Sequence, residues 1–400
     1  MVDIAPADAG RGSATRDLFE ILRDGRPRTR SELSAMTGFA RSTVALRVDA
    51  LMRQGLVRSI GDAISTGGRP SSQFVFNAAG RVVLAVDVGA SHIKIAVCDL
   101  VSNCIAERQV DIEVAEGPDA VLTWVEENGD DLLASAGRAP GDLLAVGVGL
   151  PGPVEHRSGR PINPPIMPGW DRYDVAGRLS AHFGTPVLVD NDVNIMALGE
   201  REYAWPEVEH MLFVKVATGI GSGVISAGQL QRGAQGTAGD IGHVSVSRDR
   251  DILCACGNRG CLEALAGGPA LARALTTPTA AVSTAQDVVE LLRHGNLEAI
   301  QAVRQAGRDV GEVLTTCVSL MNPSVIVIGG SMAQAGEHFI AGVREMVYSR
   351  SMPLATEHLQ IIQSKAGARA AILGASVLAI QFAFSPDRVE EMVLGARQPA

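Results

Sequence analysis

The segment 236-GTAGDIGHVSVSRDRDILCACGNRGCLEALAG-267 holds three of the six cysteines in a chain of 400 residues. Cysteines at this density, beside a histidine, favour metal ligation over a disulfide framework. His243, Cys254, Cys256 and Cys261 offer four soft or borderline ligands, which close a tetrahedron around Zn²⁺ and leave no open position. We therefore predict a structural zinc ion in this segment. Three free buried cysteines are the alternative, since the C-x-C spacing is shorter than in most zinc sites.

Composition places the chain among ordinary globular proteins. Hydrophobic residues make up 46% and charged residues 20%, and 400 residues exceed one hydrophobic core, so we expect two or three domains. The sequence has neither an apolar run of about eighteen residues nor the apolar core of a signal peptide. We expect a cytoplasmic protein without membrane contact, in which Cys98, Cys104 and Cys317 are ordinary core or surface residues.

Charge divides the chain unevenly. Residues 1–80 hold eleven arginines and eight acidic residues, a balance of +3, whereas the whole chain carries −9, which leaves −12 for the remainder. A basic N-terminal unit on an acidic body suggests that only the first segment contacts DNA. A solvated basic face is the alternative that charge alone leaves open.

The first eighty residues show the spacing of a helix-turn-helix. Apolar residues recur at helical intervals in three short segments, the third through Val44, Val48 and Leu51. Thr29, followed three residues later by Glu32, predicts a capping box at the start of the second helix. After the helices, two short strands at residues 56–60 and 73–76, joined by a glycine-rich tip, predict a wing.

The third helix and the wing supply side chains suited to DNA. The candidates for contacts to base edges, phosphates and the minor groove are Arg41, Ser42, Thr43, Arg47 and, at the wing tip, Arg69. Side chains at the N-terminal end of a recognition helix reach the major groove, and an arginine beside glycines can enter a narrow minor groove. We predict a winged helix-turn-helix in residues 1–80 that binds double-stranded DNA. A dimerisation or packing module is the alternative.

From residue 81 onward the chain repeats a strand, a glycine-rich turn and a second strand. The pattern opens with 82-VVLAVDVGASHIKIAVCDL-100 and returns at 211-MLFVKVATGIGSGVISAGQL-230. A repeated opening of this kind indicates two similar α/β lobes that face one cleft, where small ligands usually bind. We predict lobes at residues 81–203 and 204–400, with the C-terminal helix packing back on the first lobe.

These features together resemble the ROK family of repressors, open reading frames and sugar kinases. The resemblance runs from residue 82 to the GARAAILGAS segment near the C-terminus, and residues 236–267 are its most specific part. It implies an actin-like, ribonuclease-H-like body of two lobes, and the winged helix in front resembles the repressor branch. The expected fold class is therefore α/β, an actin-like body preceded by an α+β winged helix-turn-helix domain.

The resemblance also implies a sugar site. In the family's kinases the counterpart of Asp192 takes a proton from the sugar hydroxyl, and other counterparts bind hydroxyl groups. The sugar-binding candidates here are Asn163, Asn191, Asp192, Asp240, His243 and Glu263. His243 would serve twice, with one ring nitrogen on zinc and the other toward the ligand. Asp240 stands where the family usually has Glu, which implies a changed sugar or weaker binding.

Each of these residues also has a simpler interpretation when it is taken alone. Asn191 and Asp192 follow a strand where a helix begins, so either could be a helix cap. Asn163 precedes Pro164 and could be a turn residue. Glu263 could cap the predicted zinc loop, which comprises residues 240–263. Their combined spacing favours the sugar site.

The nucleotide half of the cleft departs from the family. The first phosphate loop of its active kinases reads Asp-x-Gly-Gly-Thr-Lys, whereas this chain has 87-DVGASHIK-94. Glycines let backbone amides approach phosphates without a Cβ, so this cradle is damaged, while the second turn is mostly kept. The vestigial nucleotide-binding candidates are Asp87, Gly89, Ser91, Thr218, Gly219, Gly221, Gly329 and Gly330.

We predict a sugar-responsive regulator of transcription that represses carbohydrate genes. A homodimer or tetramer would bind operator DNA, and a monosaccharide or sugar phosphate would close the lobes and release the DNA. One alternative is an active sugar kinase that uses ATP and Mg²⁺, with Asp192 as its catalytic base and a regulatory DNA-binding segment. Another is a scaffold that docks a sugar-uptake protein through the zinc loop. Residues 344–357 are a candidate subunit interface.

Overall fold

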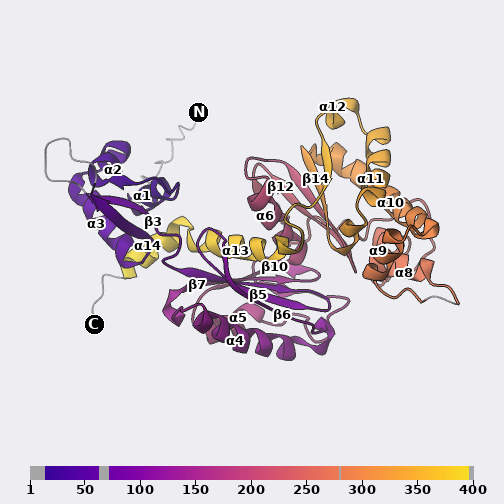
Figure 1. Cartoon of the computed structure of the whole chain (residues 1–400), viewed down its shortest axis with the longest axis horizontal. Helices are drawn as coiled ribbons and strands as arrows, with labels where there is room; N and C mark the ends of the chain where they lie inside the picture. Colours follow the sequence, from indigo (N-terminus) through magenta and orange to yellow (C-terminus); the bar gives the residue numbers. More distant parts are fainter. Residues whose placement is uncertain (1–13, 63–71, 279–280, 396–400) are drawn as a thin grey trace, which may run out of the picture.

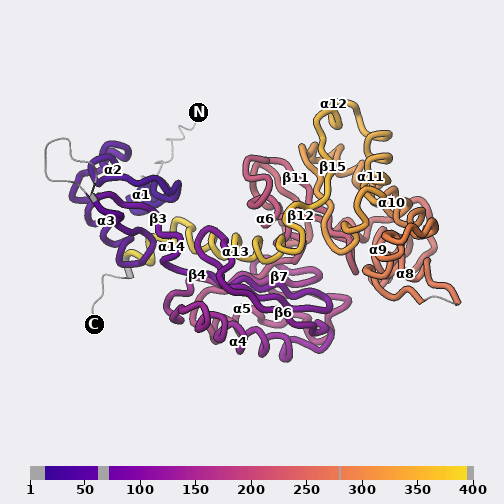
Figure 2. Tube along the Cα trace, viewed as in Figure 1, coloured from indigo at the N-terminus to yellow at the C-terminus, as the bar shows by residue number. Residues whose placement is uncertain are grey.

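The computed structural model describes residues 14–62, 72–278 and 281–395 (Figure 1). A winged unit formed by N-terminal residues lies at one end, and two α/β lobes follow, each built on a five-stranded sheet. The C-terminal helices return past the first sheet to the winged unit, as the trace in Figure 2 shows. The first and last helices, α1 and α14, are therefore neighbours.

The N-terminal unit has the three helices and the wing that the sequence predicts. Its elements are α1 (Ala14–Leu22), β1 (Arg28–Thr29), α2 (Arg30–Thr37), α3 (Arg41–Arg53), β2 (Val57–Asp62) and β3 (Ser72–Phe76), with the strands in the order β1-β3-β2. The predicted capping box is confirmed, because Glu32 N donates to Thr29 Oγ1 and Thr29 N donates to Glu32 Oε2. The wing tip, with Arg69, lies outside the described residues.

The first lobe is a mixed sheet. Its strands are β4 (Val82–Val88), β5 (Ile93–Cys98), β6 (Cys104–Val110), β7 (Leu143–Leu150) and β10 (Val187–Asn191), in the order β10-β7-β4-β5-β6. The first three are antiparallel, whereas β4, β7 and β10 are parallel, so their carboxyl ends share one edge of the sheet. Ligands of open α/β sheets bind outside that edge. A small hairpin, β8 (Val154–Glu155) with β9 (Arg160–Pro161), lies beyond it.

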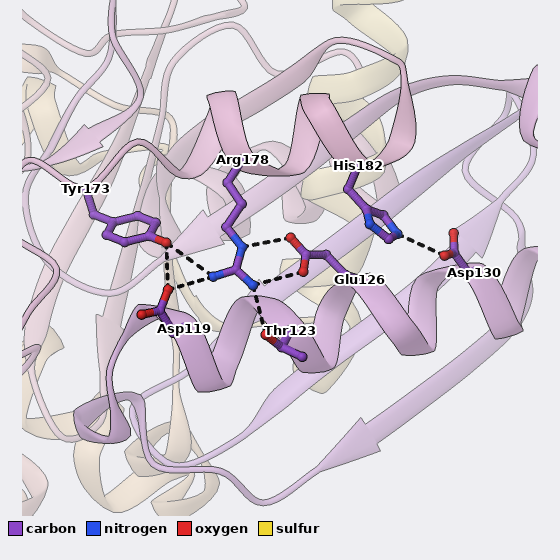
Figure 3. A network of polar contacts seen from close by, with 7 residues as sticks. All are labelled: Asp119, Thr123, Glu126, Asp130, Tyr173, Arg178 and His182. Carbon is purple, nitrogen blue, oxygen red and sulfur yellow. Dashed lines mark hydrogen bonds and ion pairs between the residues drawn. The ribbon is translucent and has the colours of Figure 1, made fainter.

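Helices α4 (Pro118–Ser135) and α5 (Val175–Phe183) cover the outer face of the first sheet. Arg178 of α5 fastens the pair, because its guanidinium donates to both Glu126 carboxylate oxygens at 2.8 and 2.9 Å and also to Asp119 and Thr123 (Figure 3). The hydrogen bonds with the Glu126 carboxylate raise the pKa of the Arg178 guanidinium above its ordinary value. His182 pairs with Asp130 one turn along. These contacts hold α4 and α5 together on the outer face of the sheet.

The second lobe repeats the arrangement of the first. Its strands are β11 (Met211–Val216), β12 (Ile220–Ser226), β13 (Gln229–Leu230), β14 (Val325–Gly329) and β15 (Gln360–Gln363), in the order β13-β12-β11-β14-β15. Like β4 and β5, strands β11 and β12 form an antiparallel hairpin, and β11, β14 and β15 are parallel. The helices of this lobe are α7 (Leu262–Ala266), α8 (Gly268–Leu275), α9 (Ala285–Arg293), α10 (Leu297–Met321), α11 (Glu337–Arg350) and α12 (Pro353–Thr356).

Two helices cross between the lobes. In α6 (Asp192–Ala204), Gly199 meets the backbone of α13 (Ala370–Ala383) at Ala370, and Gly374 of α13 meets the carbonyl of Ile195 in return. The missing side chains let the two backbones touch. Helix α13 also packs on β4 and β7, and it leads into α14 (Pro386–Gly395).

Helix α14 and the end of α13 share a hydrophobic core with the winged unit. Phe384 lies 4.9 Å from Phe19 and 5.9 Å from Phe76, measured between ring centroids, and these rings belong to one apolar cluster that continues into the first sheet.

Among the described residues, no single helix is long and apolar enough to cross a membrane. One pair bent by 61°, Gly367–Ala383 with Pro386–Val393, has the length and composition for it.

Candidate functional site

A cleft of about 900 Å³ lies between the two lobes, at the carboxyl edges of both sheets. All six sugar-binding candidates line this one cleft, as do all eight nucleotide-binding candidates. The strands β4, β7 and β10 end on one side, and β11 and β14 end on the other. Residues far apart in the sequence therefore meet here because parallel strands present their carboxyl ends together.

The four predicted metal ligands form one cluster at the rim of the cleft. Their ligand atoms all lie within 4.8 Å of one another, with Cys254 Sγ 3.7 Å from His243 Nδ1 and Cys256 Sγ 3.7 Å from Cys261 Sγ. A tetrahedron with Zn–S bonds of about 2.3 Å has edges of about 3.8 Å, so the residues fit a zinc ion. Burial raises the pKa of Cys261 to about 12, and a metal ion would reverse this shift by displacing the proton.

The zinc loop is short and tightly turned. Leu253 pairs with Arg259, and Ser245 with Cys261, in isolated bridges that fold the loop back on itself. Gly257 takes a φ of 88°, a left-handed conformation that favours glycine. The loop then needs anchors outside itself, because its own core is small.

Two contacts supply those anchors. Arg248 Nη2 lies 2.7 Å from Oδ2 of Asp309, a buried residue of α10, and Ser247 Oγ donates to Glu312 Oε2 at 2.9 Å. The loop is thereby attached to the longest helix of the second lobe. This wall of the cleft thus holds the Cys₃His cluster on one side and is fastened to α10 on the other.

The same loop presents polar groups to the cleft. His243 directs Nδ1 toward Cys254, while its Nε2 lies 4.0 Å from Asp240 Oδ1. Glu263 Oε2 accepts a hydrogen bond from the backbone N of Ile220 at 3.0 Å, and so ties the loop to the β11–β12 turn. The arrangement offers a ligand one imidazole and one half-exposed carboxylate, Asp240. Such groups suit hydroxyls that both donate and accept hydrogen bonds.

The two asparagines have structural contacts of their own. Asn191 is the N-cap of α6, with Oδ1 accepting from Val193 N at 2.9 Å and Nδ2 donating to the Gly152 carbonyl at 2.8 Å. It fixes the start of the helix that carries Asp192. Asn163 adopts a φ of 43° and its backbone N donates to Asp171, which leaves the side chain exposed at the rim.

Asp192 has a partner that the sequence analysis missed. Lys215 Nζ, on β11 of the other lobe, lies 2.5 Å from Asp192 Oδ2, and only 6% of the aspartate side chain is exposed. Burial alone would lower the pKa of Lys215, yet the Asp192 and Asp87 carboxylates outweigh it and raise the pKa. The ammonium is therefore held charged across the base of the cleft. A lysine in an apolar strand is the signal that could have revealed it.

The turn that we predict as the first phosphate turn is occupied by a side chain of the protein. A Cβ placed on Gly89 would collide with the ring of His92, so that ring lies directly against the turn backbone. His92 Nε2 lies 3.6 Å from Asp87 Oδ2, and this contact raises the histidine's pKa. In the predicted nucleotide site, an imidazole therefore fills the space beside the glycine.

The DNA candidates on α3 do not all face the same way. Arg41 and Ser42 are exposed at the start of the helix, and Thr43 is half-buried. Arg47 instead turns toward α14, where its Nη1 lies 3.4 Å from Glu390 Oε1. Leu46 is 49% exposed on the outer face of α3, an apolar side chain that the sequence analysis passed over.

Comparisons with known proteins agree with this architecture. A xylose repressor of Bacillus spizizenii is 29% identical over 365 residues, which cover 91% of this chain and 94% of that protein. A crystal structure of a ROK family transcriptional regulator, a homologue of the Escherichia coli MLC protein, has a TM-score of 0.80 at 23% identity and covers 96% of this chain and 98% of that one. The structure of the ROK hexokinase of Thermus thermophilus has a TM-score of 0.63 at 32% identity and covers 74% of this chain and 97% of that one.

The hexokinase match covers a smaller share of this chain than the regulator match, which spans nearly all of it. The family model for ROK proteins matches residues 83–382, three quarters of the sequence. The cleft, the Cys₃His cluster and the repeated hairpin lobes all fall within that range. This chain belongs to the ROK family.

Proposed function

We propose that this protein is a sugar-responsive repressor of transcription. The observation that carries the proposal is a continuous connection from the cleft to the winged unit. The segment before and at the start of α13 lines the cleft at Gly367, Ala368 and Ala371, and α14 contacts the winged unit at the other end. Full-length relatives are named xylose repressors, which supports a role in DNA binding and in sensing a sugar.

The ligand that best suits the cleft is a monosaccharide or its phosphate. Asp240 and His243 from the zinc loop and Asn163 from the first lobe present polar groups from two sides. A pyranose bridging them would hold the lobes together. Zinc would act only as a structural ion, because the four ligands leave it no open position.

A ligand moves the DNA-binding unit only if it binds one arrangement of the molecule more tightly than another. Helix α6 packs on β11 and β12 of the second lobe, and α13 packs on β4 and β7 of the first, so closure of the lobes would act on the crossing of α6 and α13. The C-terminal helix then carries that change to α3, through Gln54 Nε2 donating to the Met392 carbonyl at 2.8 Å and through the Arg47–Glu390 pair. Release of DNA on sugar binding is the expected direction, from a homodimer or tetramer on its operator.

A sugar kinase is the second candidate function. The retained Asp192 and the similarity to a glucokinase of Halalkalibacterium halodurans, 27% identical over 326 residues, favour it. Two contacts oppose it. A general base must be free to take a proton, but the Asp192 carboxylate forms an ion pair with Lys215, and His92 occupies the turn where phosphate would approach.

A ligand screen tests the proposal. Thermal unfolding is followed with glucose, xylose, N-acetylglucosamine or N-acetylmannosamine, each with and without Mg-ATP. One sugar should raise the Tm by several degrees at about 100-fold excess over its Kd, because binding to the native state stabilises it by about 2.7 kcal/mol. Asp240→Ala should lose this shift, whereas Glu298→Gln, an exposed change on α10, should keep it.

A second experiment measures DNA affinity, with a duplex that the wild-type protein has enriched from a random-sequence pool. The stabilising sugar should weaken binding at least tenfold, and Arg41→Ala should weaken it without sugar, while Arg273→Ala in the second lobe should not. If no sugar that binds changes the DNA affinity, the repressor proposal fails. Sugar-dependent ATP hydrolysis that Asp192→Asn abolishes would establish the kinase instead.

A further inference from the structure

Two cysteines outside the zinc loop lie opposite each other on neighbouring strands of the first sheet. Cys98 ends β5 and Cys104 begins β6, and the two are register partners at a bulge in this antiparallel pair. Beside them, Asp99 N donates to the Asn103 carbonyl at 2.9 Å. Because hydrogen-bonded and non-hydrogen-bonded pairs alternate, Cys98 and Cys104 form a non-hydrogen-bonded pair, whose Cα atoms lie about 4.5 Å apart. That spacing is within the range that a disulfide spans.

The two thiols differ in ways that suit a stepwise oxidation. Cys98 is fully buried, whereas Cys104 is exposed. The neighbouring Cys104 thiol, together with burial, raises the pKa of Cys98, and the neighbouring Cys98 thiol lowers the pKa of Cys104. The Cys104 sulfur is therefore the reachable sulfur and the one that more readily becomes a thiolate, which is the form that attacks.

We propose that Cys98 and Cys104 form a reversible intrachain disulfide by exchange with a low-molecular-weight disulfide. The Cys104 thiolate attacks one sulfur of that disulfide, which forms a mixed disulfide and expels the first small thiolate. Cys98 then loses its proton to that thiolate and attacks the Cys104 sulfur, which closes the protein bond and expels the second thiolate. The protein gives up two electrons and two protons, and the small disulfide becomes two thiols.

The pair lies where the body receives the winged unit. Leu100, in the loop between the two cysteines, donates its backbone N to the Ala78 carbonyl at 3.0 Å, just after the last wing strand. Cys98 and Leu100 also belong to the apolar cluster that holds Phe384 and the helices of the winged unit. A disulfide would fix this loop, and with it the docking point of the DNA-binding unit.

The zinc-loaded, full-length protein is tested in buffers of oxidised and reduced glutathione. After acid quenching, denaturation and alkylation, trypsin releases residues 95–108, a peptide that carries both cysteines and no others. In the oxidised buffer this peptide should lose two hydrogen atoms and escape alkylation, and reduced glutathione should restore both alkylated thiols. The result is independent of sugar or DNA binding, so it stands or falls apart from the repressor proposal.

Variants make the outcome decisive. Cys104→Ser, an exposed change, should abolish the closed peptide and leave Cys98 unmodified under the same buffer. Cys98→Ala should instead trap one glutathione on Cys104. Cys317→Ser, on α10 of the other lobe, should behave as wild type. If the wild-type peptide stays fully alkylated, or stops at a glutathione adduct on Cys104 without closing, the proposal is overturned.

Discussion

At the scale of single residues, Glu200 shows how a buried carboxylate positions a wall of the cleft. It lies on α6 with no exposed surface, and it accepts hydrogen bonds from Ser364 Oγ at 2.6 Å, Lys365 N at 2.9 Å and Ala366 N at 3.0 Å. Ser364 lines the cleft, so this carboxylate holds the approach to α13 in place. A buried carboxyl group is tolerated here because three donors satisfy it.

Glu200→Gln should destabilise the protein by about 2 kcal/mol, because the amide NH₂ group would face donors that need an acceptor. Equilibrium unfolding in urea measures the change. Glu202→Gln, an exposed position on the same helix, is the matched control and should stay within about 0.5 kcal/mol of wild type. Equal stabilities of the two variants would mean that Glu200 does not hold residues 364–366 in place.

The residue scale is also where sequence reasoning was least complete. The Cys₃His spacing identified a cluster that the fold brings together, because its members lie within one short segment. Lys215 and Asp192 are on different lobes, so their contact depends on how the lobes meet, which no local pattern encodes. Arg47 was assigned from helical spacing alone, and its partner Glu390 is more than 300 positions away.

At the scale of elements, the zinc loop should depend on its predicted metal ion because it has little core of its own. Cys256→Ser should lower the zinc content from about one ion per chain toward none, since three remaining ligands hold the ion poorly. Metal analysis measures this, and Cys104→Ser in the first lobe is the control that should keep its zinc. Chelation of the wild type should also weaken sugar binding, because His243 belongs to the cluster and Asp240 lies beside it. Unchanged zinc content in Cys256→Ser would refute the ligand set.

The crossing of α6 and α13 is a second element that permits a sharp test. A Cβ at Gly374 would fall against the Ile195 carbonyl, which is backbone and cannot rotate away. Gly374→Ala should therefore cost about 1–3 kcal/mol in urea unfolding, despite the higher helix propensity of alanine. Gly141→Ala, where the added Cβ meets nothing within 4 Å, is the control and should be neutral or slightly stabilising. A neutral Gly374→Ala would show that the helices can move apart.

At the scale of the whole molecule, the two-lobed architecture followed from the repeated hairpin motif, and the capping box placed the helix-turn-helix. The junction between the winged unit and the body did not follow from the sequence. Phe19 and Phe76 meet within the winged unit, and only the return of α13 brings Phe384 against both rings. Periodicity identifies which residues are buried in an element, but it does not say which element covers them.

That junction carries the last prediction, which follows from the proposed role in DNA binding. The Arg47 guanidinium is drawn toward α14 by Glu390, so we expect α14 to compete with DNA for this side chain. Glu390→Gln should strengthen binding to the enriched duplex about two- to fivefold, the value of a partly exposed ion pair. Arg47→Ala should weaken binding, and the double variant should match Arg47→Ala. Glu391→Gln, the exposed neighbour that pairs with Arg388, removes the same charge without freeing Arg47. Fluorescence anisotropy at fixed salt compares the four variants with wild type, and equal effects of the two glutamate changes would show that general charge, and not the pair, sets the affinity.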